Sequence, residues 1–156
     1  MPPPVMKDAC ELLDADHIAV KHLFVEYARL AMAAPKAAGD RQPLAEKICS
    51  ELTVHAQIEE EIFYPALRKA IGAPELLEEA KAEHQQAKEL IAQIQAADAG
   101  PAMDELVSQL ARAIEHHVKE ERDHLFTKAR AAPGLDLGGL AEQLKARQQE
   151  LQAQPA

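Results

Sequence analysis

The sequence predicts an all-α protein, an antiparallel up-down-up-down four-helix bundle with a short extra helix at its C-terminus. Apolar residues make up 47% of the 156 residues and are mostly Ala and Leu, whereas aromatic residues make up only 3%. Ala, Leu, Glu, Gln and Lys favour helices, and the β-branched residues that favour strands are few. Pro and Gly divide the chain into four long segments of similar length, which short loops would join as antiparallel neighbours.

The first two helices are bounded by prolines and a glycine. One helix is expected from about Lys7 to Ala34, and the loop PKAAGDRQ follows it. The second helix is expected from Pro43, at the first helical position, to a C-terminal cap at Gly72. Pro65 lies inside this segment and lacks a backbone donor, so we expect a kink or a tightened turn there.

Two further prolines open the next helices. Pro74 opens the third helix, which ends near ADAG, and Pro101 opens the fourth, which ends before Pro133. The chain is therefore divided into a disordered N-terminus (1–7), the bundle (8–132), and a short polar helix with a frayed tail (133–156).

The charge of the chain limits its partners. The 26 acidic residues outnumber the 17 basic ones, for a net charge of −9. This excess argues against nucleic acid and against anionic membrane surfaces as partners. The N-terminal stretch MPPPVMKDAC resembles no secretory signal, and no apolar run is long enough to cross a bilayer, so we expect a cytoplasmic protein.

Polar residues interrupt the apolar stripe of every predicted helix. In the second helix, Ile48, Leu52, Ile62 and Ala66 recur at helical spacing and predict a buried stripe, yet polar residues fall on the same face. The interrupting residues are one histidine in each helix and, in two helices, a glutamate four residues later: His17, His55, Glu59, His84, His117 and Glu121.

The combination of these residues points to a metal centre. A single histidine on an apolar face is more often a core residue with a hydrogen-bond partner, but a buried carboxylate needs a counter-charge or a metal. At about 1.5 Å of rise per residue, all six groups fall in one layer of an antiparallel bundle. Four imidazoles and two carboxylates are generous for one ion and natural for two. Such mixed ligands suit non-haem iron best, and zinc and manganese are chemically compatible with them.

Four stretches around these residues resemble the hemerythrin-like family, also called the HHE cation-binding domain. They are LLDADHIAVKHLF, HAQIEEEIFYPAL, EEAKAEHQQAKEL and IEHHVKEERDHLF. The resemblance implies a four-helix bundle around a non-haem di-iron site that binds oxygen or a related diatomic molecule. Two positions depart from the oxygen carriers of the family: Lys88 replaces a second histidine of the third helix, and Arg122 stands at the usual carboxylate position, with Glu121 beside it. The chain is therefore more similar to the variant bacterial and regulatory members.

Other polar residues are expected outside the ligand set. We expect His22 and His116 at the surface, and His124 at the surface or behind the ligands. Glu60 and Glu61 are expected to face water. Tyr27 and Tyr64 suit core packing better than a place beside the metal. Cys10 and Cys49 should be free thiols on opposite sides of the metal layer, about 20 Å apart and too far for a disulfide.

The sequence thus predicts a di-iron protein that binds or senses oxygen or nitric oxide, or that buffers iron, and is not itself an enzyme. One alternative is a di-iron redox enzyme acting on peroxide or oxygen. A further alternative is a metal-free helical interaction protein, in which the buried polar layer only sets the register of the bundle.

Overall fold

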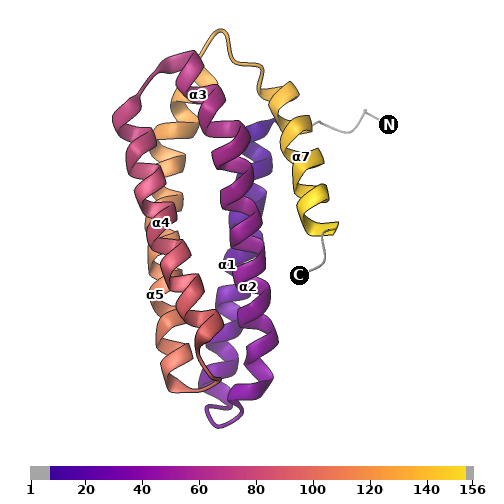
Figure 1. The fold of residues 1–156 in the computed structure, drawn as a ribbon, viewed down its shortest axis with the longest axis vertical. Helices are drawn as coiled ribbons and strands as arrows, with labels where there is room; N and C mark the ends of the chain where they lie inside the picture. The colour runs from indigo at the N-terminus through magenta and orange to yellow at the C-terminus, as the bar shows by residue number, and fades with distance from the viewer. Residues whose placement is uncertain (1–7, 154–156) are drawn as a thin grey trace.

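The computed structural model describes residues 8–153, which are helical throughout apart from short connections (Figure 1). No strand occurs in this range. The elements in chain order are α1 (Ala9–Ala33), α2 (Ala38–Ile58), the π-helical turn η1 (Glu59–Phe63), α3 (Tyr64–Ile71), α4 (Pro74–Ala96), α5 (Pro101–Glu120), the π-helical turn η2 (Glu121–Phe126), α6 (Thr127–Ala131) and α7 (Leu137–Ala153).

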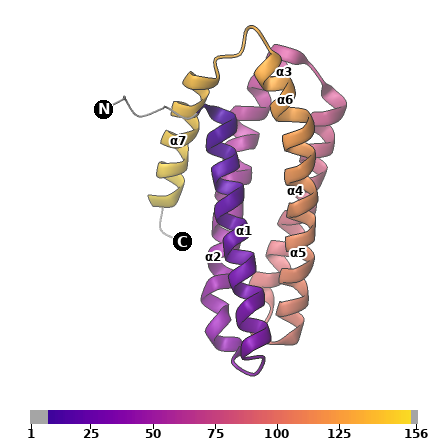
Figure 2. The same cartoon turned by 180° about the vertical axis from the view of Figure 1, so that it is seen from behind.

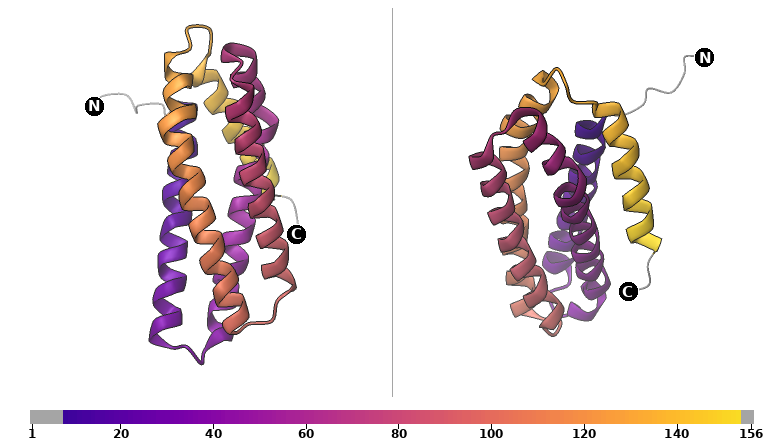
Figure 3. Two further views of the ribbon diagram at one scale, coloured as in Figure 1. Left: turned by 90° about the vertical axis from the view of Figure 1, so that its left-hand side faces the viewer. Right: turned by 45° about the horizontal axis from the view of Figure 1, so that its top comes forward.

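Four long rods form the predicted bundle. α2, η1 and α3 run on without a break as one rod, α5, η2 and α6 form another, and α1 and α4 are the other two (Figures 1 and 2). Tight connections reverse the chain between successive rods, so the up-down-up-down fold class is confirmed. α7 lies outside the rods and packs along α1 and α2 (Figure 3).

Most helix boundaries agree with the expected local chemistry. The Asp8 side chain caps α1 by accepting the backbone N–H of Glu11 at 2.8 Å. Pro74 and Pro101 stand at the first turns of α4 and α5. Gly72 ends α3 with a positive φ of 75°, which favours glycine. Residues 1–7, predicted to be disordered, lie outside the described range.

The expected start of the second helix at Pro43 is wrong. α2 begins at Ala38 and takes Pro43 into its second turn, where the missing N–H leaves only one carbonyl without its helical partner. The buried Arg41 stabilises this early turn. Its guanidinium donates to the backbone oxygens of Ala34 and Pro35 and pairs with Asp104 at 2.7 Å.

The core consists of two apolar clusters, one on each side of a polar layer. One cluster includes Cys10, Leu13 and Phe63, and the other includes Cys49 and Leu110. Both cysteines are buried and free, as predicted, and the two clusters place them on opposite sides of the layer. The polar layer therefore replaces apolar packing across the middle of the bundle.

A π-helical turn shifts the buried stripe of the second rod. Beyond Glu59 the fully buried residues are Phe63, Tyr64 and Leu67, whereas the predicted Ile62 and Ala66 are only partly buried. The i→i+5 bond from the Tyr64 N–H to the Glu59 carbonyl inserts an extra residue into the turn and rotates the remainder of the rod about its axis. Of the two expectations for Pro65, a kink or a tightened turn, the tightened turn is wrong, because a widened π-helical turn precedes the proline.

No described helix combines the length and the apolar character that crossing a bilayer requires.

We expect Asp104→Asn to lower the free energy of unfolding by about 3 kcal/mol, because it leaves the buried Arg41 guanidinium without its carboxylate. Urea unfolding followed by circular dichroism measures the change. The neighbouring Glu105→Gln is the control, since that side chain is 65% exposed and should change stability by less than about 0.5 kcal/mol. Equal losses in the two variants would contradict a stabilising role for the buried pair.

Candidate metal centre

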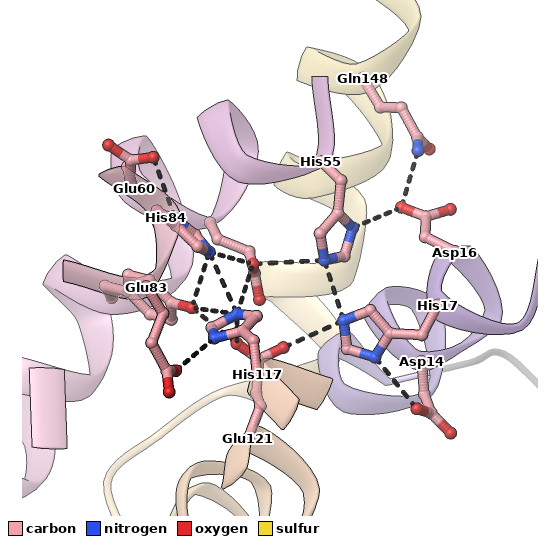
Figure 4. A network of polar contacts seen from close by, with 12 residues as sticks. Asp14, Asp16, His17, His55, Glu60, Glu83, His84, His117, Glu121 and Gln148 are labelled. Carbon is pink, nitrogen blue, oxygen red and sulfur yellow. Dashed lines mark hydrogen bonds and ion pairs between the residues drawn. The ribbon is translucent and has the colours of Figure 1, made fainter. Parts of the chain in front are cut away.

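The structure brings all six predicted residues together in the polar layer between the two apolar clusters (Figure 4). α1 and α4 each supply one histidine, and the rods containing η1 and η2 each supply a histidine and a glutamate. The four histidines are 5–7% exposed, and both glutamates are 0% exposed. The three-and-four residue spacing therefore identified a true inward-facing set.

The donor atoms of these residues form two groups, each compact enough to hold one metal ion. The groups are His17, His55, Glu59 and Glu121, and Glu59, His84 and His117. Glu59 belongs to both, because its Oε1 lies 3.2 Å from His55 Nε2 and 3.1 Å from His84 Nε2. Glu121 also spans them: Oε1 lies 3.2 Å from His17 Nε2, and Oε2 lies 3.3 Å from His117 Nε2.

The spacing of the nitrogens suits metal coordination. The Nε2 atoms of His17 and His55 lie 3.0 Å apart. Those of His84 and His117 lie 3.1 Å apart. Two ligands bound at right angles to one ion, each at about 2.1 Å, stand about 3 Å from one another. The inward nitrogens are therefore already at the separation of neighbouring ligands.

Each inward-facing imidazole is held from behind by a carboxylate. The Nδ1 atoms of the four histidines donate to carboxylate oxygens at 2.7–3.2 Å, in the pairs His17–Asp14, His55–Asp16, His84–Glu60 and His117–Glu83. Such contacts place the Nδ1 proton outward, turn Nε2 toward the centre and make it more basic. Asp16 and Glu83 each directly precede one histidine in sequence but hold the histidine of another rod.

These four outer carboxylates have further partners at the edge of the bundle. Arg122 Nε donates to Asp14 at 2.6 Å, and Lys88 Nζ donates to Glu60 at 2.9 Å. Gln148 of α7 donates to Asp16 at 2.9 Å, and His116 lies 3.2 Å from Glu83. The two residues that depart from the oxygen carriers, Lys88 and Arg122, therefore act on the centre through a carboxylate.

The side chains of the centre do not by themselves satisfy all of its buried polar atoms. Glu59 Oε2 and Glu121 Oε1 are buried and accept no hydrogen bond of good geometry, although Glu121 Oε1 lies 3.2 Å from His17 Nε2; this is costly for carboxylate oxygens. Burial lowers the pKa of His55, but the charge of Glu59 and hydrogen bonds to Asp16 and Glu59 raise it to about 10. Burial likewise lowers the pKa of His117, but hydrogen bonds to three carboxylates raise it to about 12. The protonated imidazoles of His55 and His117 thus supply the positive charge that a metal ion would otherwise supply. The donor set fits a metal ion, which would also bind the two carboxylate oxygens that accept no hydrogen bond.

Tyr64, for which the sequence favours core packing over a place beside the metal, faces the centre. Its hydroxyl donates to Glu121 Oε2 at 2.6 Å and lies 3.3 Å from His84 Nε2. Burial and the charges of Glu121 and Glu59 raise the pKa of this phenol well above its usual value, so it is a neutral donor in the metal-free protein. The register shift of η1 turns Tyr64 inward, and regular helical spacing could not have predicted it.

The remaining candidates lie away from the centre. His22 is exposed, and the side chains of His116 and His124 are 63% and 50% exposed, as expected. Tyr27 donates to Asp104 at 2.6 Å, beside Arg41 and far from the six ligand candidates. Glu61 pairs with Arg147 of α7, whereas the Glu60 side chain is only 27% exposed and accepts from His84. The expectation that Glu60 simply faces water is therefore wrong.

The hemerythrin HHE cation binding domain model matches residues 8–129 of the chain. The chain belongs to this family. Over 94% of its length it is also similar to a crystal structure from Mycobacterium kansasii, titled as a hemerythrin HHE cation binding domain-containing protein and Rv2633c homolog. That match has a TM-score of 0.77 and 26% identity, and it covers 88% of the other chain. The HHE family and the His/Glu cluster together indicate that the chain binds a cation.

A longer relative also matches most of the chain. A protein named DNA nickase from Nostoc sp. (strain PCC 7120 / SAG 25.82 / UTEX 2576) is 32% identical over 124 residues. The match covers 77% of this HHE chain but 33% of the nickase, so the chain spans about a third of that relative.

The metal-free protein should lose stability as the pH rises from about 6.5 to 10. The folded-state pKa values of His55 and His117 exceed the ordinary value of 6.5. The protonated imidazoles therefore stabilise the fold fully below pH 6.5, and this stabilisation is lost as the pH rises toward about 10 for His55 and about 12 for His117. Urea unfolding at pH 6 and pH 9.5 measures this loss. The metal-loaded protein is the control, because a bound ion replaces those protons and should flatten the dependence. A metal-free protein that is equally stable at both pH values would contradict this assignment.

Glu83→Gln should weaken metal binding about 10–100-fold, because it removes the carboxylate that orients the His117 ring. Competition with a coloured chelator measures the affinity. Glu89→Gln, at an exposed position of the same helix, is the matched control and should bind like the wild type. Unchanged affinity in Glu83→Gln would show that the negative charge of Glu83 is not needed, because the Gln amide oxygen can still accept from His117 Nδ1.

Proposed function

We propose that the centre holds two iron ions and presents them to a small diatomic ligand, oxygen or nitric oxide. His17 and His55 would be terminal ligands of one ion, and His84 and His117 of the other. Glu59 and Glu121 would bridge the two. The observation that carries this assignment is that both buried glutamates face both pairs of histidines.

The composition of the site favours iron. Imidazole and carboxylate donors together suit non-haem iron, whereas purely soft or purely oxygen ligands would favour other metals. Zinc and manganese accept the same donors and are the competing ions. Acidic side chains surround the imidazoles, and their negative potential favours a highly charged cation over the protons of the metal-free state.

A small cavity beside the histidines supports the choice of a diatomic ligand. Its volume is about 30 Å³, and its walls include all four metal-site imidazoles together with the apolar side chains of Leu52, Ile91, Ile114 and Val118. A space of this size accepts a water-sized or diatomic molecule. The apolar walls would favour a neutral gas over an ion.

The protein residues have a limited and specific role in this function. Iron, when bound, supplies a redox-active centre with coordination positions open to a small molecule. The imidazoles fix the ions, the outer carboxylates hold the imidazoles in one tautomer, and the apolar walls of the cavity limit access of water. Iron buffering would use the same ligands without the cavity.

A di-iron enzyme acting on peroxide or oxygen is the second candidate, since peroxide also fits the small cavity. Steady peroxide consumption by the iron-loaded protein, lost in Glu121→Ala, would favour it over simple binding. The metal-free interaction protein is disfavoured by the two orphan carboxylate oxygens. The net charge of −9 argues against nucleic acid as a partner, and a mobility-shift assay with intact and nicked DNA tests this point. A cytoplasmic location remains our prediction.

His17→Ala should abolish binding of a complete iron pair, because it removes an imidazole that no described neighbour can replace. Anaerobic iron loading followed by metal analysis and Mössbauer spectroscopy measures occupancy, and exposure to nitric oxide tests the open position. His22→Ala is the control, since His22 is exposed on the same helix. Wild-type protein that takes up no iron after loading at neutral pH would refute the proposal.

A further inference from the structure

The two halves of the centre share the same residue spacing and the same ring geometry. In each half, two histidine rings meet at a centroid distance of 4.7 Å and an angle of 64°. In each half, a glutamate follows the histidine of its rod by four residues and opens a π-helical turn. The two halves can therefore be compared position by position, and a residue that differs between them can be assigned to one half.

The halves differ five residues after the glutamate. In η2 this residue is Phe126, whose ring stacks on His17 at 6.1 Å and brings no polar atom. The corresponding residue after η1 is Tyr64, whose ring lies 5.4 Å from that of His84. Tyr64 is 5% exposed, so its hydroxyl is enclosed with the donors of the second half.

The Tyr64 oxygen lies where a metal ligand would be expected. It stands 3.3 Å from His84 Nε2 and 3.5 Å from His117 Nε2. These distances are close to the roughly 3 Å between neighbouring ligands of one ion. The oxygen also lies 2.6 Å from Glu121 Oε2, the carboxylate oxygen that faces the same half.

The two compact donor groups also differ in size. The first contains four residues and the second contains Glu59, His84 and His117, although Glu121 Oε2 also lies 3.3 Å from His117 Nε2. Lys88, one turn after His84, supplies no inward donor, because its ammonium pairs with Glu60 at the edge of the bundle.

We infer that Tyr64 is a further ligand of the metal ion held by His84 and His117. This inference rests on the proposed iron site and deepens it. Phenolate oxygen is a hard, anionic donor that ferric iron accepts in proteins. On binding, the O–H bond of Tyr64 is replaced by an oxygen–iron bond, the proton is released to solvent, and no electron is transferred. The pair of irons is then chemically unequal, with the phenolate on one side only.

Optical and resonance Raman spectroscopy of the ferric protein test the inference. A phenolate ligand gives a visible charge-transfer band, and excitation in that band enhances tyrosine ring vibrations that shift on ring deuteration. We expect both features in the wild type and their loss in Tyr64→Phe, which should still bind iron. The chain has two tyrosines, so Tyr27→Phe is the matched control. It should keep both features, with Tyr64 as its sole tyrosine.

The outcomes separate this inference from the function on which it rests. Iron-loaded wild type without tyrosine ring vibrations, or Tyr64→Phe that retains them, overturns the ligand assignment and leaves the iron site intact. Wild type without iron overturns the proposed function itself. Should Tyr64→Phe fail to fold, the ring-deuterated Tyr27→Phe protein decides the question alone.

Discussion

Glu59 and Glu121 are fully buried carboxylates, and the surrounding bundle must compensate their negative charge. An unpaired charge at such a site costs several kcal/mol, so imidazoles must surround it and a cation must complete it. Four imidazoles do surround the pair, one from each rod, and two carboxylate oxygens still accept no hydrogen bond. The polar layer thus interrupts the apolar core at a cost in stability that metal binding can offset, since binding only to the folded state stabilises it.

The π-helical turns show how helices accommodate this layer. Each begins at a buried glutamate, and each lets the glutamate and an aromatic residue five positions later face the same interior. Pro65 and Thr127 stand at equivalent positions after the two turns: Pro65 has no N–H to donate, and the Thr127 hydroxyl donates to the Arg122 carbonyl at 3.3 Å. The missing N–H of Pro65 and the hydroxyl bond of Thr127 both compensate for the regular helical hydrogen bonds that a π-helical turn disrupts. The same kind of turn can therefore form in two rods of different sequence.

Helical periodicity predicted the fold and all six inward residues, because inward positions recur every three or four residues as long as a helix stays regular. It failed where the helix is irregular: Ile62 was predicted to be buried, and Phe63 and Tyr64 are buried instead. It also could not assign Asp16 or Glu83, since each holds a histidine of another rod and that contact exists only after the rods pack. Glu60 was misjudged for the same reason: its partner His84 lies on a different rod.

The region that controls the centre is wider than the segment matching the HHE family. That match ends at residue 129, yet Gln148 of α7 donates to Asp16, which in turn holds the imidazole of His55. Arg147 on the same helix pairs with Glu61, within η1 and two residues from a proposed bridging carboxylate. Because second-layer contacts of this kind set the orientation and basicity of ligands, α7 forms part of the polar surroundings of the centre and does not merely cover the bundle.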